Sequence, residues 1–191
     1  MQTGIEREVT ICAKFLSEGK LILYPTDTIW GIGCDATNQQ AVNKIFNLKQ
    51  RIETKSMIIL ISDANDICRY VVEPDPEILN YLSKTSRPTT AIYKNGINIA
   101  RGLINDDGTV AIRIVSDEFC VGLINTFNRP IVSTSANISG KPSPKNFNEV
   151  SEEIKNGVDY IVQHRQDDFG GARPSTIIKM NDEKKIVVVR S

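Results

Sequence analysis

Apolar residues recur at helical spacing in two segments near the N-terminus. Residues 5–18 carry them three or four positions apart and end before Gly19: Ile5, Val9, Cys12, Ala13 and Leu16. Residues 38–48 repeat this pattern with Ala41, Val42, Ile45, Phe46 and Leu48. A spacing of this kind places the apolar side chains on one face of a helix. Both segments are therefore predicted to be amphipathic helices.

Short apolar runs and further helical segments alternate along the rest of the chain. The runs predict strands at residues 21–24, 57–61, 89–93, 109–115, 130–133, 160–163, 175–179 and 186–190, and helices are expected at 75–83, 119–127 and 143–156. Residues 109–115 alternate apolar and polar positions, so this strand is expected to be half exposed. Alternation of helices and strands is typical of an α/β fold with a mixed sheet. A single domain over residues 1–191 is predicted.

Composition narrows the class of protein further. Lysine plus arginine equals aspartate plus glutamate at 23 each, so the chain has no net positive charge that would indicate a nucleic-acid partner. The four cysteines are far apart and form no C-x-x-C pair, which argues against a zinc site and a disulfide framework. No signal peptide and no apolar run of membrane length is present. A reduced, soluble, cytoplasmic protein is expected.

A turn rich in polar side chains follows the first predicted strand, with Thr26, Asp27 and Thr28 in sequence. Taken alone, such residues favour a structural turn. Gly31 and Gly33 shift the balance towards ligand binding, because glycine lets the backbone approach a ligand closely. Gly-x-Gly-x-x-Ala also matches the dinucleotide fingerprint. However, that fingerprint needs its first glycine directly after the first strand and an acidic residue at the end of the second strand. Here Gly31 does not directly follow the first strand, and Glu53 lies before the second strand, so nicotinamide binding is disfavoured.

Two other segments suggest phosphate chemistry. Lys49, Arg51 and Lys55 follow the second helix, where helix capping and polyphosphate binding are equally good interpretations. The loop STSANISG, residues 133–140, offers many donors to phosphate oxygens but lacks the first glycine and the hydroxyl residue of a P-loop. His164 is the sole histidine, so metal triads and Ser-His-Asp hydrolysis would depend on it. Catalysis by positioning and charge is favoured.

Taken together, these motifs resemble the YrdC/TsaC family of threonylcarbamoyl-AMP synthases, in its short, single-domain form. The resemblance covers about residues 19–190 and is carried by YPTDTIWGIGCDA (24–36), Lys49-x-Arg51, Lys55-Ser56-Met57, GTVAIR (108–113), STSANISG and PSTII (174–178). The family usually has proline where Ile52, Ser56 and Val115 stand, and a W-P-G-P-x-T-like turn where residues 85–90 stand. It implies a twisted open mixed sheet flanked by helices, with a concave ligand cleft.

The resemblance also implies a nucleotidyltransferase reaction. L-threonine, bicarbonate and ATP, with Mg²⁺, would yield threonylcarbamoyl-AMP and pyrophosphate, and downstream proteins would transfer the product to a tRNA adenosine beside the anticodon. Implied catalytic residues are Lys49 and Arg51. ATP would be held by Lys49, Arg51, Lys55, Ser133, Ser135, Asn137, Ser139 and Arg190. Threonine would be held by Thr26, Thr28, Arg113 and Thr176, and no protein metal site is implied.

A non-catalytic module that binds double-stranded RNA is the alternative function. Family members are linked to such RNA through a basic concave face, and Lys44, Lys49, Arg51 and Lys55 would supply a patch here. The zero net charge argues against strong nonspecific binding.

Overall fold

The computed structural model describes residues 3–50, 57–169 and 173–191. Its helices are α1 (Gly4–Ser17), α2 (Gln39–Leu48), α3 (Pro76–Lys84), α4 (Glu118–Phe127) and α5 (Glu152–Asn156), with short 3₁₀ helices η1 (Ala64–Arg69), η2 (Arg101–Leu103) and η3 (Phe147–Glu149). Its strands are β1 (Ile22–Tyr24), β2 (Gly31–Gly33), β3 (Ile58–Ile61), β4 (Thr89–Tyr93), β5 (Val110–Ile114), β6 (Ile131–Ser135), β7 (Tyr160–Ile161), β8 (Thr176–Met180) and β9 (Ile186–Arg190).

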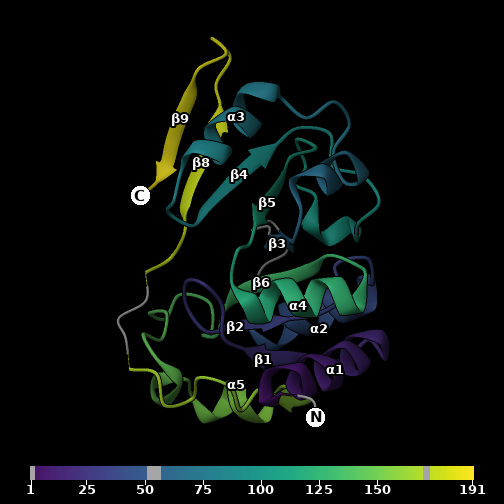
Figure 1. The fold of residues 1–191 in the computed structure, drawn as a ribbon, viewed down its shortest axis with the longest axis vertical. Helices are drawn as coiled ribbons and strands as arrows, with labels where there is room; N and C mark the ends of the chain where they lie inside the picture. Colours follow the sequence, from purple (N-terminus) through teal and green to yellow (C-terminus); the bar gives the residue numbers. More distant parts are fainter. Residues whose placement is uncertain (1–2, 51–56, 170–172) are drawn as a thin grey trace.

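The strands of the described residues form one mixed sheet in the order β7-β1-β2-β6-β3-β5-β4-β8-β9. Strands β3 and β5 are parallel, as are β4 and β8, whereas β2 pairs antiparallel with both β1 and β6. The β8–β9 hairpin lies at one end of the molecule with α3, and β1, α1 and α5 lie at the other (Figure 1). The predicted α/β fold with a twisted mixed sheet flanked by helices is confirmed.

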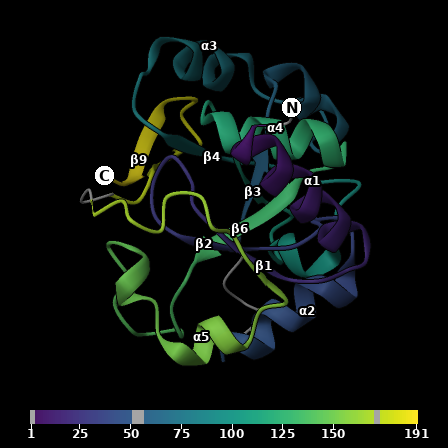
Figure 2. The ribbon, with the colours of Figure 1, turned by 60° about the horizontal axis from the view of Figure 1, so that its bottom comes forward.

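Helices cover both faces of the sheet. On β1, Ile22 and Tyr24 pack with α1 and α4, while Leu21 and Leu23 pack with α2 on the opposite face. Figure 2 shows α1 and α4 separated from α2 by β1, β2 and β6. Because successive side chains of a strand point to opposite faces, one short apolar run serves two cores.

Polar side chains at helix starts explain where the helices begin. Thr3 and Glu6 form a capping box at α1, and the side chain of Asn38 accepts hydrogen bonds from the backbone of Gln40 and Ala41 at α2. Asp75 and Asp117 cap α3 and α4 in the same way. Such caps satisfy backbone donors that have no partner within the helix.

Several details differ from the sequence-based expectations. Strand β5 is buried along nearly its whole length rather than half exposed, because it lies in the interior of the sheet between β3 and β4. Strand β6 continues to Ser135, so the expected polar loop begins as a strand. Of the helix expected at 143–156, only α5 and the short η3 form. The side chain of Asn146 binds the backbone of residues 148 and 149, which offers this segment a turn in place of a longer helix.

The glycines of the hydroxyl-rich segment form the unexpected strand β2. A Cβ atom on Gly33 would lie 2.6 Å from Cε1 of Tyr24 and 3.0 Å from the carbonyl oxygen of Val132. Only glycine therefore fits between β1 and β6 at this position. Since β1 and β2 are antiparallel neighbours, the βαβ setting of a dinucleotide fingerprint is absent from this segment.

Candidate functional site

A cavity of about 220 Å³ opens where the turn after β1 meets the ends of several strands. Its wall is formed by the turn and β2, by β5 and β6, and by the segment around β8 and β9; it includes Thr28, Gly31, Arg113, Ser133, Ser135 and Arg190. These residues lie far apart in the sequence. The fold thus brings together members of the predicted threonine and nucleotide sets.

Arg113 is the main buried cation of this cavity wall. It lies on β5, between Leu60 of β3 and Thr90 of β4, and only 3% of its side chain is exposed. Its Nε and Nη2 atoms are buried and have no hydrogen-bond acceptor among the described residues. Together these two N–H groups form the edge of a guanidinium that binds a carboxylate in a bidentate manner. Arg113 therefore lines the cavity and holds a buried guanidinium edge that has no hydrogen-bond acceptor among the described residues.

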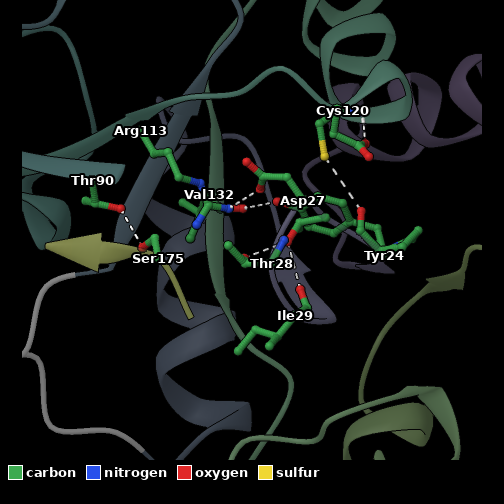
Figure 3. Close-up of polar contacts among 12 residues, drawn as sticks. Tyr24, Asp27, Thr28, Ile29, Thr90, Arg113, Cys120, Val132 and Ser175 are labelled. Carbon is green, nitrogen blue, oxygen red and sulfur yellow. Dashed lines mark hydrogen bonds and ion pairs between the residues drawn. The ribbon is translucent and has the colours of Figure 1, made fainter. Parts of the chain in front are cut away.

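Asp27 is the counter-ion of Arg113. Figure 3 shows Asp27, from the turn after β1, facing Arg113. Its Oδ1 lies 3.0 Å from Nη2 of Arg113, without the alignment of a hydrogen bond. Burial raises the pKa of the Asp27 carboxyl above its ordinary value, and the charge of Arg113 opposes this rise. The ion pair consequently leaves both partners incompletely satisfied.

The hydroxyl groups of Thr26 and Thr28 form a directed chain. Thr26 Oγ1 donates to the carbonyl oxygen of Ile29 at 2.8 Å and lies 2.9 Å from Thr28 Oγ1. A hydroxyl has one hydrogen, so Thr28 must be the donor in the Thr26–Thr28 contact. The Thr28 hydroxyl, which lines the cavity, is then left with acceptor capacity only. It suits a ligand group that donates a hydrogen bond.

The STSANISG segment is anchored by Lys49. This side chain is 1% exposed, and its ammonium group donates to the carbonyl oxygens of Ser135 and Asn137, the latter at 2.6 Å. The Lys49 carbonyl accepts from the backbone N–H of Ser139 at 2.9 Å. Ser133 and Ser135 line the cavity, whereas Asn137 and Ser139 lie beyond its described wall. Lys49 thus holds the loop at the end of β6 in place through the loop's backbone carbonyl and N–H groups.

The C-terminal hairpin supplies the opposite wall. Arg190 donates from Nη2 to the carbonyl oxygen of Ser175 at 2.9 Å, and Ser175 Oγ lies 2.8 Å from Thr90 Oγ1. Burial and then the nearby Arg113 lower the pKa of the Arg190 guanidinium, which means that two cations approach one cavity. Ser175 and Ile177 line the cavity and Thr176 between them does not, because alternate residues of a strand face opposite ways.

A second, smaller cavity of about 40 Å³ lies on the other side of the turn. It shares Thr28 and Ile29 with the first cavity and also contacts Thr26. Its wall includes Arg165, whose Nη2 lies 2.7 Å from Oδ2 of Asp117. The predicted threonine residues Thr26 and Thr28 therefore belong to one turn that borders both cavities.

Sequence reasoning missed several residues of the larger cavity. Met57, Ser143 and Pro174 contribute to its wall, and Ser175 belongs to it in place of the predicted Thr176. Ser143 was expected to begin a helix, and a serine in a loop carries no sequence signal of its own. Side chains alternate between the two faces from Ser175 into β8, so Ser175 and Ile177 face the cavity. The sequence PSTII does not say which of the two alternating sets does so.

Arg51 and Lys55 of the predicted cationic cluster lie outside the described residues, as do Ile52 and Ser56, where the family usually has proline. The other two members use their ammonium groups within the protein. Lys44 donates to the carbonyl oxygen of Gly19 at 2.8 Å, and Lys49 binds the loop described above. His164 stacks on Phe119 with ring centroids 5.9 Å apart.

Among the described residues, no group of three or more histidine, cysteine or acidic residues is placed to hold a metal ion. The described residues of the larger cavity wall include hydroxyls and arginines, and none of them is a carboxylate. None of the helices in residues 3–50, 57–169 and 173–191 has the length and apolar character needed to cross a membrane.

Comparisons with known proteins agree with this geometry. The family model Sua5/YciO/YrdC, described as telomere recombination, matches residues 14–191. A threonylcarbamoyl-AMP synthase of Pyrococcus abyssi is 32% identical over 93% of this chain and 52% of its own length. One from Acinetobacter baumannii is 31% identical over 91% of this chain and 94% of its own.

A solved structure shows the same fold. The structure of P. abyssi Sua5 complexed with L-threonine has a TM-score of 0.85 and 31% identity, and the match covers 97% of this chain. It covers 54% of that protein, so the chain spans about half the length of this relative. The match over most of the sequence and the shared fold lead to one conclusion: the chain belongs to the Sua5/YciO/YrdC family.

Proposed function

We propose that this protein is a threonylcarbamoyl-AMP synthase. It joins L-threonine, bicarbonate and ATP into threonylcarbamoyl-AMP and releases pyrophosphate, and the product serves threonylcarbamoyl modification of a tRNA adenosine next to the anticodon. The names of its relatives support the reaction, and one of them was solved with L-threonine. The residues of the larger cavity support the substrates.

The observation that carries the proposal is the unsatisfied edge of Arg113. A buried guanidinium whose Nε–H and Nη2–H lack acceptors is costly unless a ligand supplies oxygen atoms. A carboxylate does so with two parallel hydrogen bonds and an opposite charge. We therefore assign the α-carboxylate of threonine to Arg113.

Thr28 completes the recognition of the amino acid. Its hydroxyl has only acceptor capacity left, so it suits the amine or the side-chain hydroxyl of threonine, both of which donate. Thr26 positions Thr28 by accepting the hydrogen bond from its hydroxyl. The cavity of about 220 Å³ is also small for a whole nucleotide, since sites for drug-sized ligands usually measure roughly 300–1,000 Å³. In our proposal the amino acid fills the enclosed part and the nucleotide lies towards its mouth.

The nucleotide is assigned to the β6 side of the cavity. Ser133 and Ser135 offer hydroxyl groups there, and Arg190 offers positive charge across from them. Lys49 keeps the 133–140 segment in place through its carbonyl contacts. Arg51 and Lys55 are proposed to meet the polyphosphate. Mg²⁺ is proposed to enter with ATP, held mainly by the substrate phosphates.

The chemistry then requires alignment more than a covalent partner. The threonine nitrogen, as the neutral amine, bonds to the carbon of bicarbonate, and one oxygen of bicarbonate leaves as water with a proton from the nitrogen. An oxygen of the resulting carbamate attacks the α-phosphorus of ATP while the bond to pyrophosphate breaks. Transfer to phosphorus is accelerated by positioning and by neutralising charge on the phosphate oxygens. Arg113 and Thr28 fix the amino acid, and the cations on the nucleotide side stabilise the departing pyrophosphate.

Release of pyrophosphate from ATP tests the proposal. It is expected only when L-threonine and bicarbonate are both present, and L-valine should not replace L-threonine if the side-chain hydroxyl is recognised. Pyrophosphate release that is indifferent to threonine would refute the proposal. RNA binding without any threonine-dependent release would instead favour the RNA-binding alternative, and its affinity should then fall steeply with salt.

A further inference from the structure

Asp27 and the cavity share a single guanidinium. Arg113 lines the cavity, and its Nε and Nη2 are buried without a hydrogen-bond partner among the described residues. Nη2 is also the atom that lies 3.0 Å from Oδ1 of Asp27. Asp27 is 11% exposed at its side chain and is not part of the described cavity wall. It therefore acts on a ligand through Arg113, as a positioning residue. A ligand carboxylate that binds the Nε–Nη2 edge approaches the same nitrogen.

We propose that Asp27 and the carboxylate of an amino-acid ligand compete for Arg113, so that Asp27 takes up a proton when the ligand binds. The inference rests on the proposed function, which assigns a carboxylate to Arg113. In the free protein one negative and one positive charge face each other in a largely buried place. The α-carboxylate of the ligand places a second negative group beside the same guanidinium, and burial makes two carboxylates on one cation costly.

The neighbours of Asp27 make protonation the available response. Asp117 and Cys120 of α4 face it, as do Tyr24 of β1 and Arg165. Nη2 of Arg165 is paired with Asp117 at 2.7 Å, while its Nε has no hydrogen-bond partner among the described residues. Arg113 is the cation in direct contact with Asp27 and therefore its main counter-charge.

The direction of the pH dependence follows from linkage. Burial already raises the pKa of Asp27 in the free protein, and a ligand carboxylate on Arg113 raises the pKa of Asp27 further. Between the free and the bound pKa the complex holds more protons than the free protein, so affinity increases as pH falls through this window. With uptake of up to one proton, each pH unit inside the window strengthens threonine binding by up to about tenfold.

Calorimetric titration with L-threonine tests this inference. Titrations between about pH 5 and pH 8, in buffers with different ionisation enthalpies, measure both the affinity and the number of protons taken up. The wild-type protein is expected to take up a proton and to bind more tightly as the pH falls. Asp27→Asn should remove the uptake, flatten the pH profile and bind threonine more tightly than the wild type at the alkaline end.

Two control variants separate this role from a general effect of charge or folding. Asp75→Asn makes the same chemical change at the start of α3, where asparagine caps equally well, and should keep the proton uptake. His164→Gln removes the sole histidine and should keep it too. A purely structural Asp27 would change stability without changing proton uptake.

The outcomes are distinct. Threonine binding to the wild type without proton uptake would overturn the inference and leave the proposed function standing. Uptake that persists in Asp27→Asn would overturn it as well. If L-threonine fails to bind the wild-type protein at all, the proposed function is refuted and this inference with it.

Discussion

Truncation of Arg113 gives the sharpest test of the amino-acid subsite. Arg113→Ala removes the guanidinium that the structure holds at 3% exposure on the cavity wall. Because the ligand carboxylate would then lie in a buried place without its counter-charge, the loss should be that of a broken buried pair. Such truncations typically cost about 2–5 kcal/mol in binding.

That energy translates into a large and selective change. Each 1.4 kcal/mol is tenfold in affinity, so the dissociation constant for threonine should rise roughly 30-fold to several thousand-fold. The KM for ATP should change by much less, since Ser133 and Ser135, which we propose to contact the nucleotide, are retained. Arg113→Lys keeps the charge but loses the two-pronged edge, so its effect should lie between the wild type and Arg113→Ala.

Steady-state pyrophosphate release, with threonine and ATP varied separately, measures this selectivity. Direct titration with threonine and a thermal unfolding scan accompany it, because Arg113→Ala also strips Asp27 of its partner and lowers stability. The double variant Arg113→Ala, Asp27→Asn removes that orphaned charge and should regain stability without regaining threonine affinity. Equal increases in the KM values for threonine and ATP would refute the assignment of the carboxylate to Arg113.

Three further predictions concern the scaffold around the site. Lys49→Met removes two charge-assisted hydrogen bonds to the 133–140 segment, so a loss of about 2–4 kcal/mol in unfolding free energy is expected in denaturant titrations; an unchanged midpoint would mean that Lys49 does not anchor the loop. Gly33→Ala places a Cβ 2.6 Å from Cε1 of Tyr24 and should lower the unfolding free energy in denaturant titrations by about 1–3 kcal/mol. An unfolding free energy equal to that of the wild type would contradict the tight fit of β2. Asn128 ends α4 with φ of 57°, so Asn128→Val should lower the unfolding free energy by about 1–2 kcal/mol while Asn128→Gly leaves it nearly unchanged; equal effects would exclude backbone strain as the cause.

Much of the fold was accessible from local patterns. The sequence predicts strands at residues 89–93 and 186–190 with the bounds that β4 and β9 have, and the spacing of apolar residues locates α1 and α2. The missed strand β2 shows the limit of such patterns. Its residues look like a turn, and only the approach of Tyr24 and Val132 from neighbouring strands explains why glycine is needed there.

The site was less accessible, for a physical reason. Arg113, Thr28, Ser133 and Ser135 lie in sequence motifs, and the structure places them, together with Arg190, on one cavity wall. Sequence motifs do not say which face of a strand a residue occupies; Ser175 lines the cavity, whereas the predicted Thr176 is not among its lining residues. Nor do they reveal burial, and the ion pair between Asp27 and Arg113 depends on burial for its role.

The central claim is that one cavity unites threonine, bicarbonate and ATP in a single product. Mass spectrometry of the reaction with isotope-labelled bicarbonate tests it most directly. The account predicts an adenylate that contains threonine and the labelled carbon, formed by the wild-type protein and strongly reduced in Arg113→Ala at limiting threonine. An adenylate without the labelled carbon, or the absence of any threonine-containing adenylate while ATP is consumed, would contradict it.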